Sequence, residues 1–112
     1  MALLARFVAG LVLLVAPESR ILPYRVLDDD GHGTTFAICR AVLAAMDRGA
    51  DVINLSLAYH LRSRVLDRLL DEASARGAVL VSGAGNDETG ELPFPARDRR
   101  VLAVAAVTDD GV

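Results

Sequence analysis

Three polar loops carry the residues whose chemistry suits a functional site. They span residues 28–33, 56–60 and 82–87, and each follows an apolar run that predicts a β-strand. In an open parallel sheet, ligands bind beyond the carboxyl ends of the strands, where such loops gather. The three loops are therefore the candidate site, and they offer carboxylates, histidines, serine hydroxyls and an asparagine amide.

The first loop places the carboxylates of residues 28–30 beside His32. An aspartate and a histidine form part of a hydrolytic triad only when a nucleophile faces the other ring nitrogen of the histidine. The sequence assigns no nucleophile to this loop. We therefore predict a turn shaped by Gly31 and Gly33, with His32 in solvent and the aspartates as loop carboxylates.

The composition excludes several classes of function. All 12 basic residues are arginine, which excludes a lysine Schiff base, a phosphate-loop lysine and the lysine that a receiver domain requires. The net charge is −3 and no basic run is longer than Arg99-Arg100, so we expect no nucleic-acid partner. Cys39 is the only cysteine, so we expect a small buried residue and no intrachain disulfide. We predict no cofactor and no metal.

The elements predicted from the pattern are those of an α/β protein. The 112 residues allow one domain, 1–112, and only 4% are aromatic, so the core must be built from Ala, Val, Leu and Ile, as in parallel sheets covered by helices. A helix, the residues Arg-Gly-Ala and a β-branched run follow one another twice, which is typical of consecutive βαβ units. Thr34 or Thr35 is suited to cap the first of these helices. The predicted helices are 2–15, 36–48 and about 61–76, and the predicted strands are 20–27, 51–57, 78–81 and 101–107.

The apolar segment 2–15 has two interpretations. Arg6 followed by an apolar run is similar to a signal peptide, but the run is too short to span a membrane and continues directly into the next predicted strand. We favour a buried helix, and therefore expect no membrane partner and assign no compartment. Pro23 lacks a backbone donor, which weakens the strand predicted at 20–27.

Seven short segments in a fixed order carry the most specific signal in the sequence. They are Phe7-Val8-Ala9-Gly10, Val15-Ala16-Pro17, Arg25-Val26-Leu27-Asp28, residues 49–57, Gly83-Ala84-Gly85-Asn86, Pro95-Ala96 and residues 101–107. In this order they resemble the central part of the catalytic domain of the subtilisin-like serine proteases, or subtilases. The resemblance implies a three-layer α/β fold, with a parallel sheet and helices on both faces, that is a partial subtilisin-like fold truncated at both ends.

The same resemblance implies that the catalytic triad is missing from this chain. The histidine motif of the family reads His-Gly-Thr, one residue, then Val-Ala-Gly, and Leu4 stands where that histidine would be. His32-Gly33-Thr34 spells the first three letters, but no Val-Ala-Gly follows it. The aspartate motif lies upstream of the chain and the serine motif downstream of Val112. We therefore expect a relative of serine endopeptidases that is inactive alone.

The substrate side of the site is what the resemblance retains. Asn86 matches the family asparagine whose amide donates to the oxyanion, where a fixed neutral donor stabilises the transition state. Ser56, Leu57 and Ala58 match an edge whose main chain pairs with an extended peptide or protein substrate, and Gly83, Ala84 and Gly85 match a wall of the primary specificity pocket. Ala58 replaces the usual glycine, so its methyl group is expected to crowd the substrate backbone. Ser56 is not a candidate nucleophile, because no base is placed for it.

Features of the sequence also fit, in part, functions other than that of a partial protease domain. A binding module that captures extended peptides or complements another subtilase-like chain fits the open sheet edges of a partial domain. A remnant without function fits the missing triad. A receiver-like domain fits the acidic run at 28–30 but lacks its lysine, and a dinucleotide-binding fold lacks the third glycine after Gly85.

Overall fold

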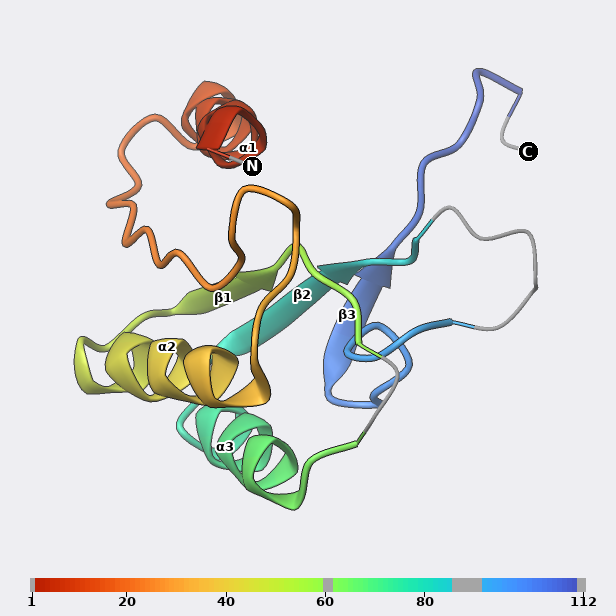
Figure 1. Ribbon diagram of the computed structural model, residues 1–112. Helices are drawn as coiled ribbons and strands as arrows, with labels where there is room; N and C mark the ends of the chain where they lie inside the picture. Colours follow the sequence, from red (N-terminus) through yellow and green to blue (C-terminus); the bar gives the residue numbers. More distant parts are fainter. Residues whose placement is uncertain (1, 60–61, 86–91, 111–112) are drawn as a thin grey trace.

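The computed structural model describes residues 2–59, 62–85 and 92–110 (Figure 1). Within them, helices and parallel strands alternate along most of the chain, as the sequence predicts. The helices are α1 (Ala2–Val15), α2 (Thr35–Asp47) and α3 (Arg64–Ala75), and the strands are β1 (Val52–Leu55), β2 (Val79–Gly83) and β3 (Val101–Val104).

The strands form one parallel sheet in the order β1-β2-β3. Ile53 pairs with Leu80, and Leu80 with Val101, so the three strands begin together and end at one edge. Each of β1 and β3 is shorter than predicted at its carboxyl end. Residues 56–58 and 105–107 therefore continue past the sheet as connecting segments.

Local sequence signals set the ends of α2 and α3. The Thr34 side-chain oxygen accepts a hydrogen bond of 3.1 Å from the Ala37 amide, and the Ser63 oxygen accepts one of 3.3 Å from the Leu66 amide. Such caps typically contribute about 1 kcal/mol each. Both helices end before a glycine with positive φ, Gly49 at 71° and Gly77 at 91°. Of the two threonines proposed as a cap, Thr34 is the one that acts.

The core lies between the sheet and the two helices α2 and α3, which cover one face together (Figure 1). Leu66, Leu70 and Ala73 of α3 are at most 1% exposed, and they pack with Leu80 of the central strand. Cys39 of α2 is buried in the same cluster, as predicted. This half of the molecule thus has the burial expected of an α/β layer.

The opposite side of the sheet is open. In Figure 1, α1 lies on that side, so helices flank both faces, but its side chains are largely exposed: Phe7 is 63% and Leu14 78% exposed. The sheet face itself exposes Val52, Leu102 and Val104 by 58% or more. The expectation of a buried helix at 2–15 is therefore wrong for this chain.

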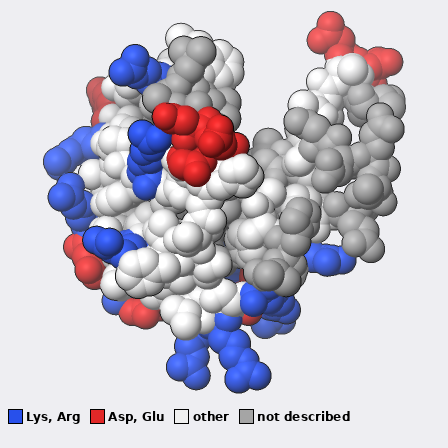
Figure 2. Space-filling model, viewed as in Figure 1, with Lys and Arg blue, Asp and Glu red and all other residues white. Residues whose placement is uncertain are grey.

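In the same view, arginines gather along the left and lower edges, beside α2 and α3, and most of the area between is uncharged (Figure 2).

The strand predicted at 20–27 is absent from the structure. A strand needs a neighbour that accepts and donates main-chain hydrogen bonds, and the described sheet ends at β1. Pro23 has no donor to contribute. The segment is instead followed by the turn that the glycines predict: the Asp28 carboxylate accepts from the amides of residues 30 and 32, and a Cβ on Gly33 would collide with the Val26 carbonyl oxygen.

Candidate functional site

Two of the predicted segments leave the sheet side by side at its carboxyl edge. Leu55, the last residue of β1, is the register partner of Ser82 in β2, so the segments Ser56-Leu57-Ala58 and Gly83-Ala84-Gly85 start from neighbouring positions. Ser56, Ala58, Gly83 and Gly85 are exposed. The backbone therefore brings together the two segments that the sequence singled out as a peptide-binding edge and a pocket wall.

Ser82 connects the two strand ends, a role that the sequence analysis did not predict. Its side chain is almost fully buried, and its hydroxyl donates a hydrogen bond of 2.9 Å to the Leu55 carbonyl oxygen. A buried hydroxyl without a partner would be costly, so this contact stabilises the junction. The Ala84 amide donates to the Val104 carbonyl oxygen at 2.8 Å, which fixes the other side of β2 to β3.

The Ser56 hydroxyl is held by a side chain rather than by the backbone. The Asn54 side-chain amide donates to it at 2.8 Å, and Asn54 comes from the open face of β1. This hydrogen bond stabilises Ser56 at the end of the strand. An amide that donates to a hydroxyl does not remove its proton, so this hydrogen bond does not activate Ser56 as a nucleophile.

A third segment, residues 92–98, lies against the ends of both segments, at Tyr59 and at Gly85. The Tyr59 amide donates to the Phe94 carbonyl oxygen at 2.8 Å in an antiparallel bridge, and the two rings stack with centroids 5.8 Å apart. Pro93 lies beside Gly85, since a Cβ there would stand 3.5 Å from the proline Cγ. The guanidinium of Arg62 lies over the Phe94 ring, 5.2 Å from its centroid. Only Pro95-Ala96 in this segment had a signal in the sequence.

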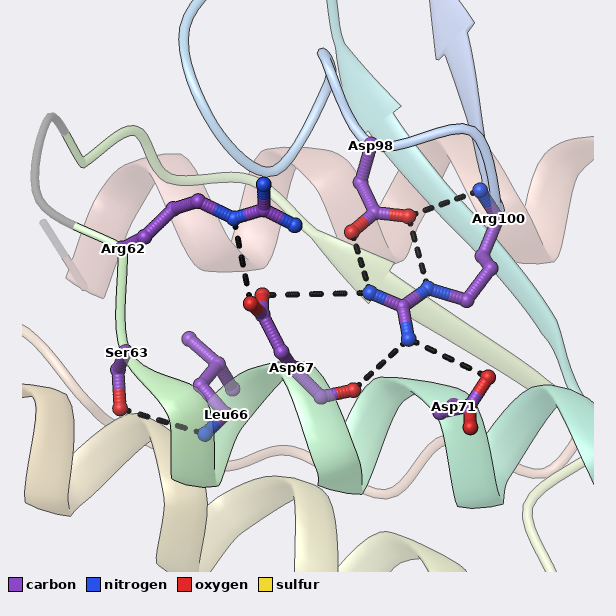
Figure 3. Close-up of polar contacts among 7 residues, drawn as sticks. All are labelled: Arg62, Ser63, Leu66, Asp67, Asp71, Asp98 and Arg100. Atoms are coloured by element: carbon purple, nitrogen blue, oxygen red, sulfur yellow. Dashed lines mark hydrogen bonds and ion pairs between the residues drawn. The ribbon is translucent and has the colours of Figure 1, made fainter.

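Segment 92–98 is anchored to α3 by a cluster of charged residues (Figure 3). Arg100 donates to both carboxylate oxygens of Asp98, at 2.9 Å and 2.6 Å, and to the Asp67 carbonyl oxygen of α3 at 2.9 Å. The Asp71 carboxylate is 3.3 Å from the same guanidinium. The hydrogen bonds that Arg100 donates to Asp98 hold the pKa of the Asp98 carboxyl below its usual value despite burial, and the same hydrogen bonds raise the pKa of Arg100.

Tyr59 lies where this cluster meets the edge segment. Burial, and then the negative charges of Asp67 and Asp98, raise the pKa of its phenol to about 12. The phenol is therefore neutral across the physiological range. It acts here as an aromatic support for Phe94 rather than as an acid or base.

Several predicted residues take no part in this geometry or lie outside it. Asn86, the predicted oxyanion donor, lies outside the described residues. Leu4, at the position of the family histidine, lies within α1. His32 is exposed in its turn, as predicted. Potential ligand atoms of Asp28, Asp30 and His32 lie within 4.8 Å of one another, but all three residues are exposed and hydrogen bonds within the turn explain their proximity.

No helix in the described part of the chain is long and apolar enough to cross a bilayer. This finding is consistent with the length of the apolar run at 2–15, the longest such run in the sequence.

Comparison with known sequences gives the family. The sequence profile of the Subtilase family matches residues 5–111, and the chain belongs to this family. The thermophilic serine proteinase of Bacillus sp. (strain AK1) is 41% identical over 93 residues, which are 83% of this chain and 23% of that protein. Subtilisin Savinase of Lederbergia lenta is 34% identical over 95 residues, which are 85% of this chain and 35% of that protein.

Comparison with solved structures gives the same fold. A crystal structure of a lanthipeptide protease superposes with a TM-score of 0.73 at 26% identity, over 85% of this chain and 33% of that one. The prenylagaramide maturation protease PagA superposes with a TM-score of 0.67, also at 26% identity, over 76% of this chain and 33% of that one. The partial subtilisin-like α/β fold is thus confirmed, and the chain spans about a third or less of these relatives. Subtilases act on peptide or protein substrates.

Proposed function

We propose that this chain forms the substrate edge and the oxyanion side of a subtilisin-like serine endopeptidase. The observation that carries the proposal is the register of β1 and β2, whose paired ends at Leu55 and Ser82 make segments 56–58 and 83–85 start together at the carboxyl edge of a parallel sheet. Membership of the Subtilase family supports it.

An extended peptide would bind by adding a strand along residues 56–58. In this mode main-chain hydrogen bonds supply the affinity, and pockets for alternate side chains supply the specificity. The exposed residues Gly83 and Gly85 leave room for a substrate side chain on the facing segment. The exposed methyl group of Ala58 lies on the edge itself and would narrow the approach of the peptide backbone.

The chemistry proposed for this chain is oxyanion stabilisation by Asn86 without nucleophilic attack. A side-chain amide aimed at the carbonyl oxygen stabilises the negative charge that develops there in the transition state. Hydrolysis also needs a nucleophile and a base, and no residue of this chain matches the family histidine or serine. We therefore expect no peptide cleavage by the chain alone, although it binds the peptide.

Titration of the isotopically labelled chain with an acetylated, amidated hexapeptide of alanine and leucine tests the peptide site. Saturable shifts of the amide resonances are expected at residues 56–58 and 83–85. Replacing Ala58 by glycine should tighten binding about fivefold by removing the methyl contact. Ala50→Gly is the matched control, because it makes the same change at the amino end of β1, and it should leave the affinity unchanged.

Each result bears on a separate part of the proposal. Absence of saturable shifts, or shifts confined to other parts of the chain, would refute the peptide site. Unchanged affinity in Ala58→Gly would refute the crowding by the methyl group. Cleavage of a chromogenic peptide by the purified chain, lost in Asn86→Ala, would refute the expectation that it is inactive alone.

A second candidate function, complementation of another subtilase-like chain, is favoured by the open side of the sheet. Apolar residues on α1 and on the sheet face, among them Phe7, Leu14 and Val104, are 58% or more exposed, and gathered exposed apolar residues are typical of interaction sites. Sedimentation velocity of the chain mixed with a purified second subtilase-like chain tests this function. A complex of defined stoichiometry would support it, and two independently sedimenting species would refute it.

A further inference from the structure

Arg100 connects two elements that are far apart in the sequence. Its guanidinium holds both oxygens of Asp98, two residues earlier, and reaches α3 through the Asp67 carbonyl oxygen and the Asp71 carboxylate (Figure 3). The Asp98 side chain is 4% exposed and that of Arg100 19%, so solvent screens this contact only weakly. The planar guanidinium fork of Arg100, with two N–H donors on one carboxylate, fixes the orientation of Asp98 as well as its distance.

The segment that Arg100 holds is itself compact. The Arg97 amide donates to the Pro93 carbonyl oxygen and the Asp98 amide to the Pro95 carbonyl oxygen, both at 2.9 Å. Pro95 and Ala96 are buried inside this turn. Residues 93–98 therefore form one hydrogen-bonded unit that connects Asp98 to Pro93 and Phe94.

The outer end of this unit lies against both segments of the proposed peptide site, residues 56–58 and 83–85, which together are called the substrate cleft. The Phe94 carbonyl oxygen accepts the Tyr59 amide, which directly follows the edge segment 56–58. Pro93 lies against Gly85, the last described residue of the facing wall. The turn at residues 93–98 thus contacts both sides of the cleft, next to the edge at 56–58 and at the wall at 83–85.

We propose that Arg100 is a positioning residue for the substrate cleft: by holding Asp98 to α3 it sets the spacing between the edge at 56–58 and the wall at 83–85. Only the expected effect on peptide binding rests on the proposed function. The coupling between Arg100 and Tyr59 is a property of the chain itself. Arg62 belongs to the same cluster, since its guanidinium lies 3.2 Å from the Asp67 carboxylate and also over the Phe94 ring.

The variant that tests it is Arg100→Lys, which keeps the charge but loses the fork. An ammonium group cannot meet both oxygens of Asp98 and the Asp67 carbonyl oxygen in the same plane. We expect hydrogen exchange of the Tyr59 amide to quicken about tenfold relative to that of Leu80 in the core, the effect of losing one hydrogen bond to a charged group. Affinity for the alanine-leucine hexapeptide should fall about threefold or more in the same variant.

The matched control is Arg76→Lys, since Arg76 pairs with Glu72 on the exposed face of α3, the helix that Arg100 contacts. It should change neither the exchange ratio nor the affinity. If Arg100→Lys does not fold, Asp71→Asn replaces it, because the Asp71 carboxylate is 79% exposed and its loss spares the core. In that variant the exchange ratio should rise about twofold.

The outcomes separate the two proposals. An unchanged ratio of Tyr59 to Leu80 exchange in the folded variant would overturn the positioning role, because a merely stabilising contact would quicken both amides together. A raised ratio in a chain whose wild type binds no peptide would uphold the positioning role and refute the proposed function. A raised ratio with unchanged peptide affinity would overturn the link between Arg100 and the cleft.

Discussion

The two sides of the sheet are built from the same residue types and differ in what covers them. On the side of α2 and α3, Leu70 is fully buried, whereas on the side of α1, Leu14 is 78% exposed. Both are leucines on helices of similar length. The comparison teaches that an apolar pattern predicts a helix, but that its burial depends on a partner surface elsewhere in the fold.

The patterns of the two helices already differ in kind. The helix α3 alternates apolar and charged residues, with Leu66, Leu70 and Ala73 on one buried stripe. The helix α1 is apolar on nearly all sides, which is typical of a helix enclosed by other elements. In this chain the described residues bury one face of α3 and leave most of α1 exposed.

The largest effect that would sharpen this comparison is a pair of leucine truncations. Leu70→Ala should lower the free energy of unfolding by about 2–5 kcal/mol, because it leaves a cavity in the core. Leu14→Ala should change it by less than about 0.5 kcal/mol, because the side chain is already in solvent. Urea unfolding followed by circular dichroism measures both. Equal losses in the two variants would break the comparison, since they would place Leu14 in a packed contact.

A smaller effect concerns the charged anchor on the covered side. Asp98→Asn should lower the free energy of unfolding by about 2 kcal/mol at neutral pH, because Arg100 loses its charged acceptor. The pKa of the Asp98 carboxyl is lower in the folded protein than its ordinary value of 3.8, so its contribution is complete above that value and lost as the pH falls through the folded one. Urea unfolding from pH 6 down to pH 2 should therefore show the two proteins converging in acid. A constant difference across this range would contradict the assignment.

The smallest effect concerns Tyr59, where the charged cluster around Arg100 meets the edge segment 56–58. In a Tyr24→Phe background, absorbance of the tyrosinate should titrate with a midpoint near 12, against about 10 in urea. Because burial and nearby carboxylates raise this pKa, the stabilisation is present below about pH 10 and is lost as the pH rises towards 12. Asp98→Asn should lower the midpoint by a fraction of a unit, since one negative charge is removed. A midpoint near 10 in the folded protein would place the phenol in solvent.

Much of the fold could be predicted because its signals are local. Thr34 and the two Arg-Gly junctions at residues 48–49 and 76–77 set helix ends through contacts within one turn. The βαβ order then required a parallel sheet, and the order of seven short segments gave the family. The adjacency of residues 56–58 and 83–85 follows from the same order, since parallel neighbours end at one edge.

The parts that could not be predicted depend on contacts between distant segments. In the described part of the chain, the segment expected to be a strand at 20–27 pairs with no neighbour beyond β1; within its own sequence only Pro23 weakens the prediction. Arg100 meets α3 across 33 positions, and Ser82 meets Leu55 across 27. Neither separation repeats with a helical or strand period, so neither leaves a pattern in the sequence.

By itself, then, the sequence determined the secondary structure of the covered side, the parallel order and the Subtilase family, because caps, glycines and β-branched runs act over a few residues. Only the tertiary structure decided which apolar faces are buried and how segment 92–98 is held against the cleft. The reason is physical: burial and ion pairing are properties of two surfaces that meet, and the chain must fold before they can.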